Sequence, residues 1–356
     1  MRSLALAALL LACDAKPSPP SPVAVPRDAT VLPSRKVSDV RADRRVELLA
    51  IVMRLTGTKE YQRAQPTPYV QAVDAHFGAF RAHRAVVLAT ELRRTKGIGY
   101  DAPMQLAVHL DANLAVVNAA ELPEIDARWT GVDVAAYASA LADFAAVSQL
   151  DTFLAAQRPY LARLEGQLHD LLANEDPLPW FDSAFGAAGA RFAVVPAPLA
   201  GTWNFGTRAT VDDKLTLYQL LGVPTTDGVY AIDASLVELL VHEMAHSYVN
   251  PVLAKHAAAI LPAATRLFEA RKAEMTKQAY GDPMIVANET CVRAIVVAYL
   301  RARHGDAVAD ASLADQERRG FVGIAALASL FGASGPSLDA RMPDVIRQLD
   351  AISSGL

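Results

Sequence analysis

Hydrophobic residues recur at helical spacing through most of the chain between residues 39 and 175. The stripe is clear over residues 46–55, where apolar side chains follow one another at intervals of three. Similar stripes cover four further segments, residues 69–95, 102–118, 132–149 and 151–173. The pattern therefore predicts a helical N-terminal portion, which we place at residues 37–180.

The pattern changes after the sequence Pro-Leu-Pro-Trp at residues 177–180. Residues 191–196 and 226–232 are rich in β-branched and aromatic side chains and are bounded by Pro and Gly, which predicts strands. Residues 201–206 between them fit a hairpin or an irregular edge. Helical spacing returns from residue 235 onward, so residues 181–356 are expected to hold a small sheet followed by helices. The chain is expected to be a mostly helical α+β protein.

The N-terminal 36 residues differ from the rest of the chain. Residues 4–12 form an apolar run that is too short to span a bilayer and is typical of a signal peptide. Residues 10–13, Leu-Leu-Ala-Cys, resemble the bacterial lipobox, which makes residues 1–13 a lipoprotein-type signal with Cys13 as the lipid-bearing residue. The alternative is an ordinary signal peptide with an incidental cysteine. Residues 14–36 are rich in Pro and Ser and predict an extended tether.

These features predict an exported protein of the cell envelope, anchored through a lipid on Cys13 on the periplasmic or the surface side. The formal net charge of −4 argues against a nucleic-acid partner, which usually meets a basic patch. The chain has two cysteines. If Cys13 carries a lipid, Cys291 has no partner within the chain, so no disulfide is expected.

Residues 235–251, SLVELLVHEMAHSYVNP, predict a buried helix. Ser235 followed by Glu238 is typical of a capping box at the start of a helix. Apolar side chains then occupy nearly every side, which predicts burial inside the protein. Asn250 and Pro251 are expected to end the helix, because the residue before a proline is pushed away from helical angles.

This helix carries the pattern H-E-x-x-H at His242, Glu243 and His246. Residues four apart lie on one helix face, so the two imidazoles can bind one metal ion, and zinc readily takes such ligands. Glu243 is placed to act as general base on a water held by that metal. The alternative is a core helix whose two histidines are hydrogen-bonded to carbonyl groups.

A second helix is predicted from Asp282 and Pro283 to about residue 304, with Asp as its cap and Pro in its first turn. Glu289 falls on the apolar stripe of this helix, and a buried carboxylate needs a cation. Arg293, one turn later, is one candidate for that cation, in a structural salt bridge. Zinc is the other, with Glu289 as third metal ligand 43 positions after His246 (289 − 246).

The metzincin pattern, in which a third histidine follows on the same segment, is excluded because Val249 and Val252 stand at its glycine and histidine places. With Asn288 before Glu289, the chain resembles the gluzincins, whose third ligand is a Glu on a later helix. The resemblance implies a zincin-like fold with a small sheet beside the helix of the motif. It also implies Zn²⁺ bound by His242, His246 and Glu289. Arg293 occupies the place where these proteins usually carry an acidic residue.

The same resemblance implies a tyrosine that stabilises the oxyanion. Tyr280 lies nine positions before Glu289 (289 − 280), much as in gluzincins of the thermolysin type, and Tyr248 is a second candidate. Simple packing is the alternative for both. The strings HEMAHSYVNP and AYGDPMIVANETCVRAI are also similar to a family of exported bacterial proteins catalogued as a domain of unknown function and presumed to be metallopeptidases.

The expected function is a zinc-dependent hydrolase that cleaves peptide bonds in a peptide or protein substrate through a metal-activated water. An amide substrate from cell-wall peptide is a further possibility within this class. The alternative from another class is a non-catalytic, envelope-anchored binding protein that retains a structural zinc site. The sequence leaves the oligomeric state and the cleavage specificity open.

Overall fold

The computed structural model describes residues 39–186, 190–201, 203–211, 214–222, 225–226, 229–230, 235–278, 280–332 and 336–356. Cys13 and the predicted signal and tether, residues 1–36, lie outside the described residues, as does the side chain of Ser235 in the predicted capping box. The chain divides into two compact units. The sheet unit comprises residues 39–176 and the described part of 189–233, and the helical unit comprises residues 177–186 and 235–356.

The sheet unit contains a four-stranded mixed sheet in the order β1-β2-β4-β3. Strand β2 pairs in parallel with both β1 and β4, and β3 pairs antiparallel with β4. A separate two-stranded antiparallel ladder joins β5 to β6. The strands are β1 (Asp39–Val40), β2 (Arg191–Pro196), β3 (Asn204–Val211), β4 (Lys214–Leu221), β5 (Thr225–Thr226) and β6 (Val229–Tyr230).

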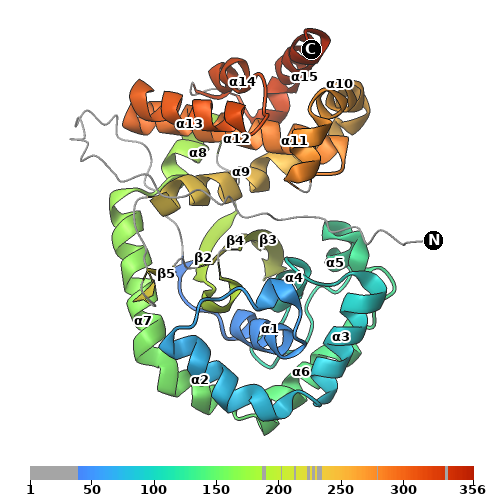
Figure 1. Cartoon of the computed structure of the whole chain (residues 1–356), viewed down its shortest axis with the longest axis vertical. Coiled ribbons are helices and arrows are strands. Elements are labelled where there is room, and N and C mark those ends of the chain that lie inside the picture. The colour runs from blue at the N-terminus through green and yellow to red at the C-terminus, as the bar shows by residue number, and fades with distance from the viewer. Residues whose placement is uncertain are drawn as a thin grey trace. The chain divides into compact units, whose positions relative to one another are not determined.

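Seven α-helices complete the described part of this unit, and Figure 1 shows α7, α2, α6 and α3 in an arc around α1 and the sheet. They are α1 (Arg44–Leu55), α2 (Pro68–Phe77), α3 (Arg84–Lys96), α4 (Ala102–Val108), α5 (Glu121–Ile125), α6 (Val134–Val147) and α7 (Leu150–Asn174). The short 3₁₀ turns are η1 (Lys59–Tyr61), η2 (Gly78–Phe80), η3 (Ala127–Trp129) and η4 (Pro198–Ala200). Helix α1 is the centre of the unit: ten of its residues are buried, and it contacts α2, α3, α4 and α6.

The helical unit is built around α12 (Pro283–His304), which contacts α9, α10, α13 and α14 (Figure 1). Among the described residues α12 is the one helix long and apolar enough to cross a membrane, and 78% of its most apolar window is buried inside the protein, as in a core helix. The other helices are α8 (Leu178–Phe185), α9 (Ser235–Lys255), α10 (Ala257–Ala270), α11 (Lys272–Lys277), α13 (Asp306–Arg318), α14 (Ile324–Phe331) and α15 (Leu338–Ser354).

The predicted α+β class is confirmed: the structure is mostly helical with a small mixed sheet. The two compact units differ from the expected division at residue 180, because the sheet belongs with the N-terminal helices and not with the helix of the motif. The reason is long-range strand pairing. Asp39 pairs with Ala193 and Val40 with Val194, which joins the first described residues to β2.

Two local predictions of the second half need correction. The segment 226–232 was expected to be one strand, whereas its described residues belong to two short strands, β5 and β6. Helix α9 does not end at Asn250 but continues through Pro251 to Lys255. Proline within a helix costs ~3 kcal/mol. Full burial of Val249 and Leu253 on either side contributes ~1.5–3 kcal/mol each, which offsets that cost.

Glu47 of α1 is a buried carboxyl group in the core of the sheet unit, with 1% of its surface exposed. The Tyr69 hydroxyl on α2 donates a hydrogen bond to Glu47 Oε2, and Glu47 Oε1 has no hydrogen-bond partner among the residues that the structure describes. Burial raises the pKa of Glu47 from 4.5 to about 7, and the nearby Asp43 carboxylate acts in the same direction. The folded protein therefore favours the protonated form of this side chain.

Glu47 is expected to make stability depend on pH. Because its pKa is raised in the fold, its stabilising contribution is complete below about pH 4.5 and is lost as pH rises through about 7. Relative to Glu47→Gln, the wild-type free energy of unfolding should fall by on the order of 3 kcal/mol between pH 4.5 and pH 8. Chemical denaturation over that pH range measures the difference.

The matched control is Glu91→Gln, which changes an exposed carboxylate on α3 of the same unit. This variant should follow the wild-type pH dependence. If the Glu47→Gln and wild-type curves ran parallel over the whole range, burial would not be controlling the protonation of Glu47.

Candidate metal centre

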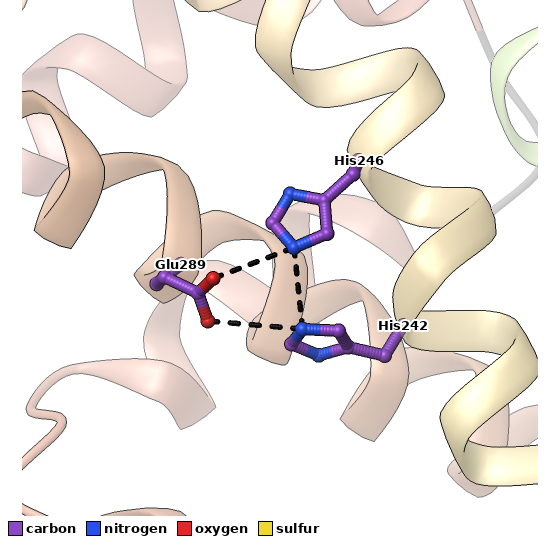
Figure 2. Close-up of side chains that lie close together, drawn as sticks. All are labelled: His242, His246 and Glu289. Atoms are coloured by element: carbon purple, nitrogen blue, oxygen red, sulfur yellow. Dashed lines mark hydrogen bonds and ion pairs between the residues drawn. The ribbon is translucent and has the colours of Figure 1, made fainter. Parts of the chain in front are cut away.

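Helix α9 places both histidines of the motif on one face. Leu240, Val241 and Met244 are at most 1% exposed and hold the helix in the core of the unit. His242 and His246, one turn apart, project from α9 toward the same point, and their Nε2 atoms are 3.2 Å apart (Figure 2). The imidazoles are therefore arranged as a pair of ligands that face one another, as the spacing predicts.

Helix α12 supplies the third side chain. The Asp282 side chain accepts hydrogen bonds from the backbone N–H groups of Met284 and Ile285, so the helix begins at the predicted cap. Glu289, two turns further along, is 3% exposed. Because α12 packs against α9, the Glu289 carboxylate faces both imidazoles across the interface of the two helices (Figure 2).

The distances fit a metal site. His246 Nε2 lies 3.4 Å from Glu289 Oε1, and His242 Nε2 lies 3.7 Å from Glu289 Oε2. One donor atom from each of the three residues lies within 4.8 Å of the others. Tetrahedral zinc with bonds of about 2.0–2.1 Å separates neighbouring donors by roughly 3.3–3.4 Å. The three side chains could therefore hold a metal ion with little movement.

The hydrogen bonds of His246 favour metal binding by its Nε2 atom. Asn250 Oδ1 lies 3.2 Å from His246 Nδ1 and, as an acceptor, places the proton on that nitrogen. In the neutral ring, the Nε2 lone pair then faces Glu289 and His242. The helix was expected to end at Asn250, whereas it continues and puts the Asn250 amide one turn beyond His246, beside the ring.

Burial and the neighbouring charges set the protonation of the three residues. Burial lowers the pKa of His242 well below its usual value. Burial acts in the same direction on His246, but the hydrogen bond and charge of Glu289 outweigh it and raise the pKa of His246 to about 9. Burial raises the pKa of Glu289, but Arg293 and the two histidines outweigh it and hold that pKa far below its usual value.

Glu243 is 6% exposed, and burial raises the pKa of its carboxyl from 4.5 to about 7. Within the described part of the chain, no hydrogen bond or ion pair engages this carboxylate. The positive charge of His246 lowers the pKa of Glu243, and the negative charge of Glu289 raises it. A carboxylate with a pKa near neutrality and no protein partner can accept and return a proton at physiological pH.

Arg293 adds a feature that the sequence left open. Its Nη2 atom donates to Glu289 Oε2 at 3.0 Å and to the Tyr280 hydroxyl at 3.2 Å. The structure therefore contains both the salt bridge and the histidine–glutamate group: Oε2 is shared by Arg293 and His242, whose Nε2 lies 3.7 Å away, and Oε1 faces His246. Tyr280 is joined to the site through Arg293. Tyr248, the other candidate, stacks on Phe181 with ring centroids 5.0 Å apart.

The comparisons with known proteins give a family and no close relative. No curated protein and no solved structure matches the chain. One family model, described as a domain of unknown function (DUF4932), matches residues 39–332, which include the sheet unit, α9 and α12. The chain is therefore a member of this family of domains of unknown function.

Proposed function

We propose that the protein is a zinc-dependent hydrolase, most specifically a metallopeptidase. One observation carries the proposal: donor atoms of His242, His246 and Glu289 converge from two helices, and the buried Glu243 carboxylate near them forms no hydrogen bond or ion pair with the described residues. Two histidines and one glutamate leave a fourth coordination place open, which is the arrangement of a catalytic zinc site.

When bound here, zinc would supply the polarisation of an amide carbonyl and the acidification of a water molecule. Glu243 accepts a proton from the attacking water and returns it to the leaving amine, the exchange for which its pKa of about 7 is suited. Asn250 keeps the His246 proton on Nδ1. Tyr280 is the proposed donor to the oxyanion, since Arg293 fixes its hydroxyl close to the carboxylate of Glu289.

The proposed substrate is a peptide or protein, and the proposed location is the cell envelope, with a lipid on Cys13 as anchor. The Arg293–Glu289 pair favours one other function. Because Arg293 already neutralises Glu289, the three side chains also suit a structural zinc ion in a non-catalytic, envelope-anchored binding protein. Hydrolysis of a peptide probe by the zinc-loaded protein distinguishes the hydrolase from the binding protein.

Removing a ligand is expected to abolish stoichiometric zinc binding. His246→Ala and Glu289→Ala each delete one of the three donors that lie within 4.8 Å of one another. Purified wild-type protein should bind one zinc per chain, and each variant should lose at least tenfold in affinity. Competition with a chromophoric chelator measures the affinity, and elemental analysis measures the stoichiometry.

His256→Ala is the matched control, because His256 lies in the same unit but pairs with Asp339 at the surface. It should bind zinc as the wild type does. Wild-type protein that takes up no stoichiometric zinc would exclude the proposed site.

Replacing the proposed base should separate zinc binding from turnover. Glu243→Gln removes the proton acceptor but none of the three ligands, so the zinc-loaded variant should lose about 10²–10⁴-fold in kcat/KM. A mixed library of internally quenched peptides and labelled casein serve as probes for the zinc-loaded wild type. Glu269→Gln, an exposed carboxylate on α10, is the control and should retain wild-type turnover.

Full turnover by Glu243→Gln would exclude Glu243 as the base. A zinc-loaded wild type that cleaves none of these probes would favour the binding protein.

A further inference from the structure

Arg293 is the most deeply buried cation near the candidate metal centre, and its side chain is 3% exposed. It lies on α12 one turn after Glu289. Three of the side chains around its guanidinium group hold it in place. Nη1 donates to Gln316 Oε1 of α13 at 2.6 Å, and Nη2 donates to the Tyr280 hydroxyl. The Phe321 ring lies under the group, with the guanidinium carbon 4.3 Å from its centroid.

These contacts fix both the position and the plane of the guanidinium. Gln316 is 6% exposed and Phe321 is 1% exposed, so neither side chain has room to move. A planar group held by hydrogen bonds on two nitrogens and by an aromatic ring on its face has one orientation. The direction in which Nη2 meets Glu289 is therefore set by the helical unit and not by Glu289.

The bond to Glu289 differs from an ordinary buried ion pair. Arginine and carboxylate usually meet through two parallel hydrogen bonds, one to each oxygen. Here Arg293 gives a single bond, to Oε2, because its other terminal nitrogen is turned toward Gln316. Oε1 accepts no bond from Arg293 and lies 3.4 Å from His246 Nε2, whereas Oε2, the oxygen bonded to Arg293, also lies 3.7 Å from His242 Nε2.

We propose that Arg293 is a positioning residue that makes Glu289 a ligand through one oxygen. By occupying Oε2, it directs Oε1 to the metal position and keeps the carboxylate from binding the ion through both oxygens. The proposal rests on the metal site proposed above. The proposed role also explains why Arg293 occupies a place where gluzincins usually carry an acidic residue. The Arg293 guanidinium contacts the Glu289 carboxylate directly.

The test compares two buried arginines of the same unit. Arg293→Lys keeps the charge but replaces the planar fork with a point donor, so it should release the Glu289 carboxylate. Zinc affinity of the folded variant should fall about 10–100-fold, and the visible spectrum of its Co²⁺ form should change, because outer partners of ligands have effects of this size. Chelator competition and cobalt absorption measure the two effects.

Arg341→Lys is the control. Arg341 is 7% exposed, lies over the Phe185 ring, and donates to the backbone carbonyls of Ala184, Leu330 and Pro336. Its substitution should lower Tm but leave zinc affinity and the cobalt spectrum unchanged, which is also what a purely structural role of Arg293 would give.

Wild-type affinity and a wild-type cobalt spectrum in Arg293→Lys would overturn the proposal while the zinc site itself stands. Wild-type protein without zinc would overturn both. Where Arg293→Lys does not fold, Gln316→Leu decides. This variant frees the guanidinium from α13 without touching the Glu289 pair, so weaker zinc binding supports the positioning role and unchanged binding excludes it.

Discussion

The negative charge of Glu289, buried between two imidazoles and a guanidinium, is the constraint on which the helical unit depends. A carboxylate that is 3% exposed is costly unless cations or hydrogen-bond donors surround it. Arg293 donates to Oε2, His242 Nε2 lies 3.7 Å from the same oxygen, and His246 Nε2 lies 3.4 Å from Oε1. The buried carboxylate keeps these partners only if α9 and α12 stay in the same register against one another. The charge of Glu289 therefore favours one packing of the two helices, and that packing keeps the charge beside its partners.

The packing of α12 explains why the side chains of His242, His246 and Glu289 have defined positions. Helix α12 is buried along most of its length and contacts α9, α10, α13 and α14. Gln316 of α13 then sets the orientation of Arg293 together with Tyr280, which precedes α12, and Phe321, which lies between α13 and α14. The three side chains that could hold a metal therefore lie on packed helices, and their supporting contacts come from separate segments of the chain, as a preorganised site requires.

Local signals were enough to predict the central features. The spacing of His242 and His246 requires only helical geometry, and the Asp282 cap and the buried stripe of α12 placed Glu289 on the core side. These predictions depend on interactions within one or two turns. Local patterns could not predict contacts between distant segments. For example, nothing in the sequence around residue 293 indicates Gln316 or Phe321 as its partners.

The strands show the same limit. Strand β4 is buried continuously from Thr216 to Leu221, so it lacks the alternation that marks a half-buried strand, and β3 alternates with small residues such as Thr207 and Ala209 that give a weak apolar signal. Strand β4 was missed, and only the start of β3 fell in the hairpin or irregular edge expected at residues 201–206. In contrast, β2, which holds β-branched and aromatic residues and ends at a proline, was found. The parallel pairing of β1 with β2 joins residues more than 150 positions apart (193 − 39 = 154), and no short pattern encodes it.

We propose that three side chains from two helices bind one metal ion, and crystals grown with zinc can show it when diffraction is measured on both sides of the zinc absorption edge. We expect a single anomalous peak about 2.0–2.2 Å from His242 Nε2, His246 Nε2 and Glu289 Oε1, with Glu289 Oε2 still bonded to Arg293. An anomalous map without a peak between α9 and α12, or a peak that Glu289 does not contact, would contradict it.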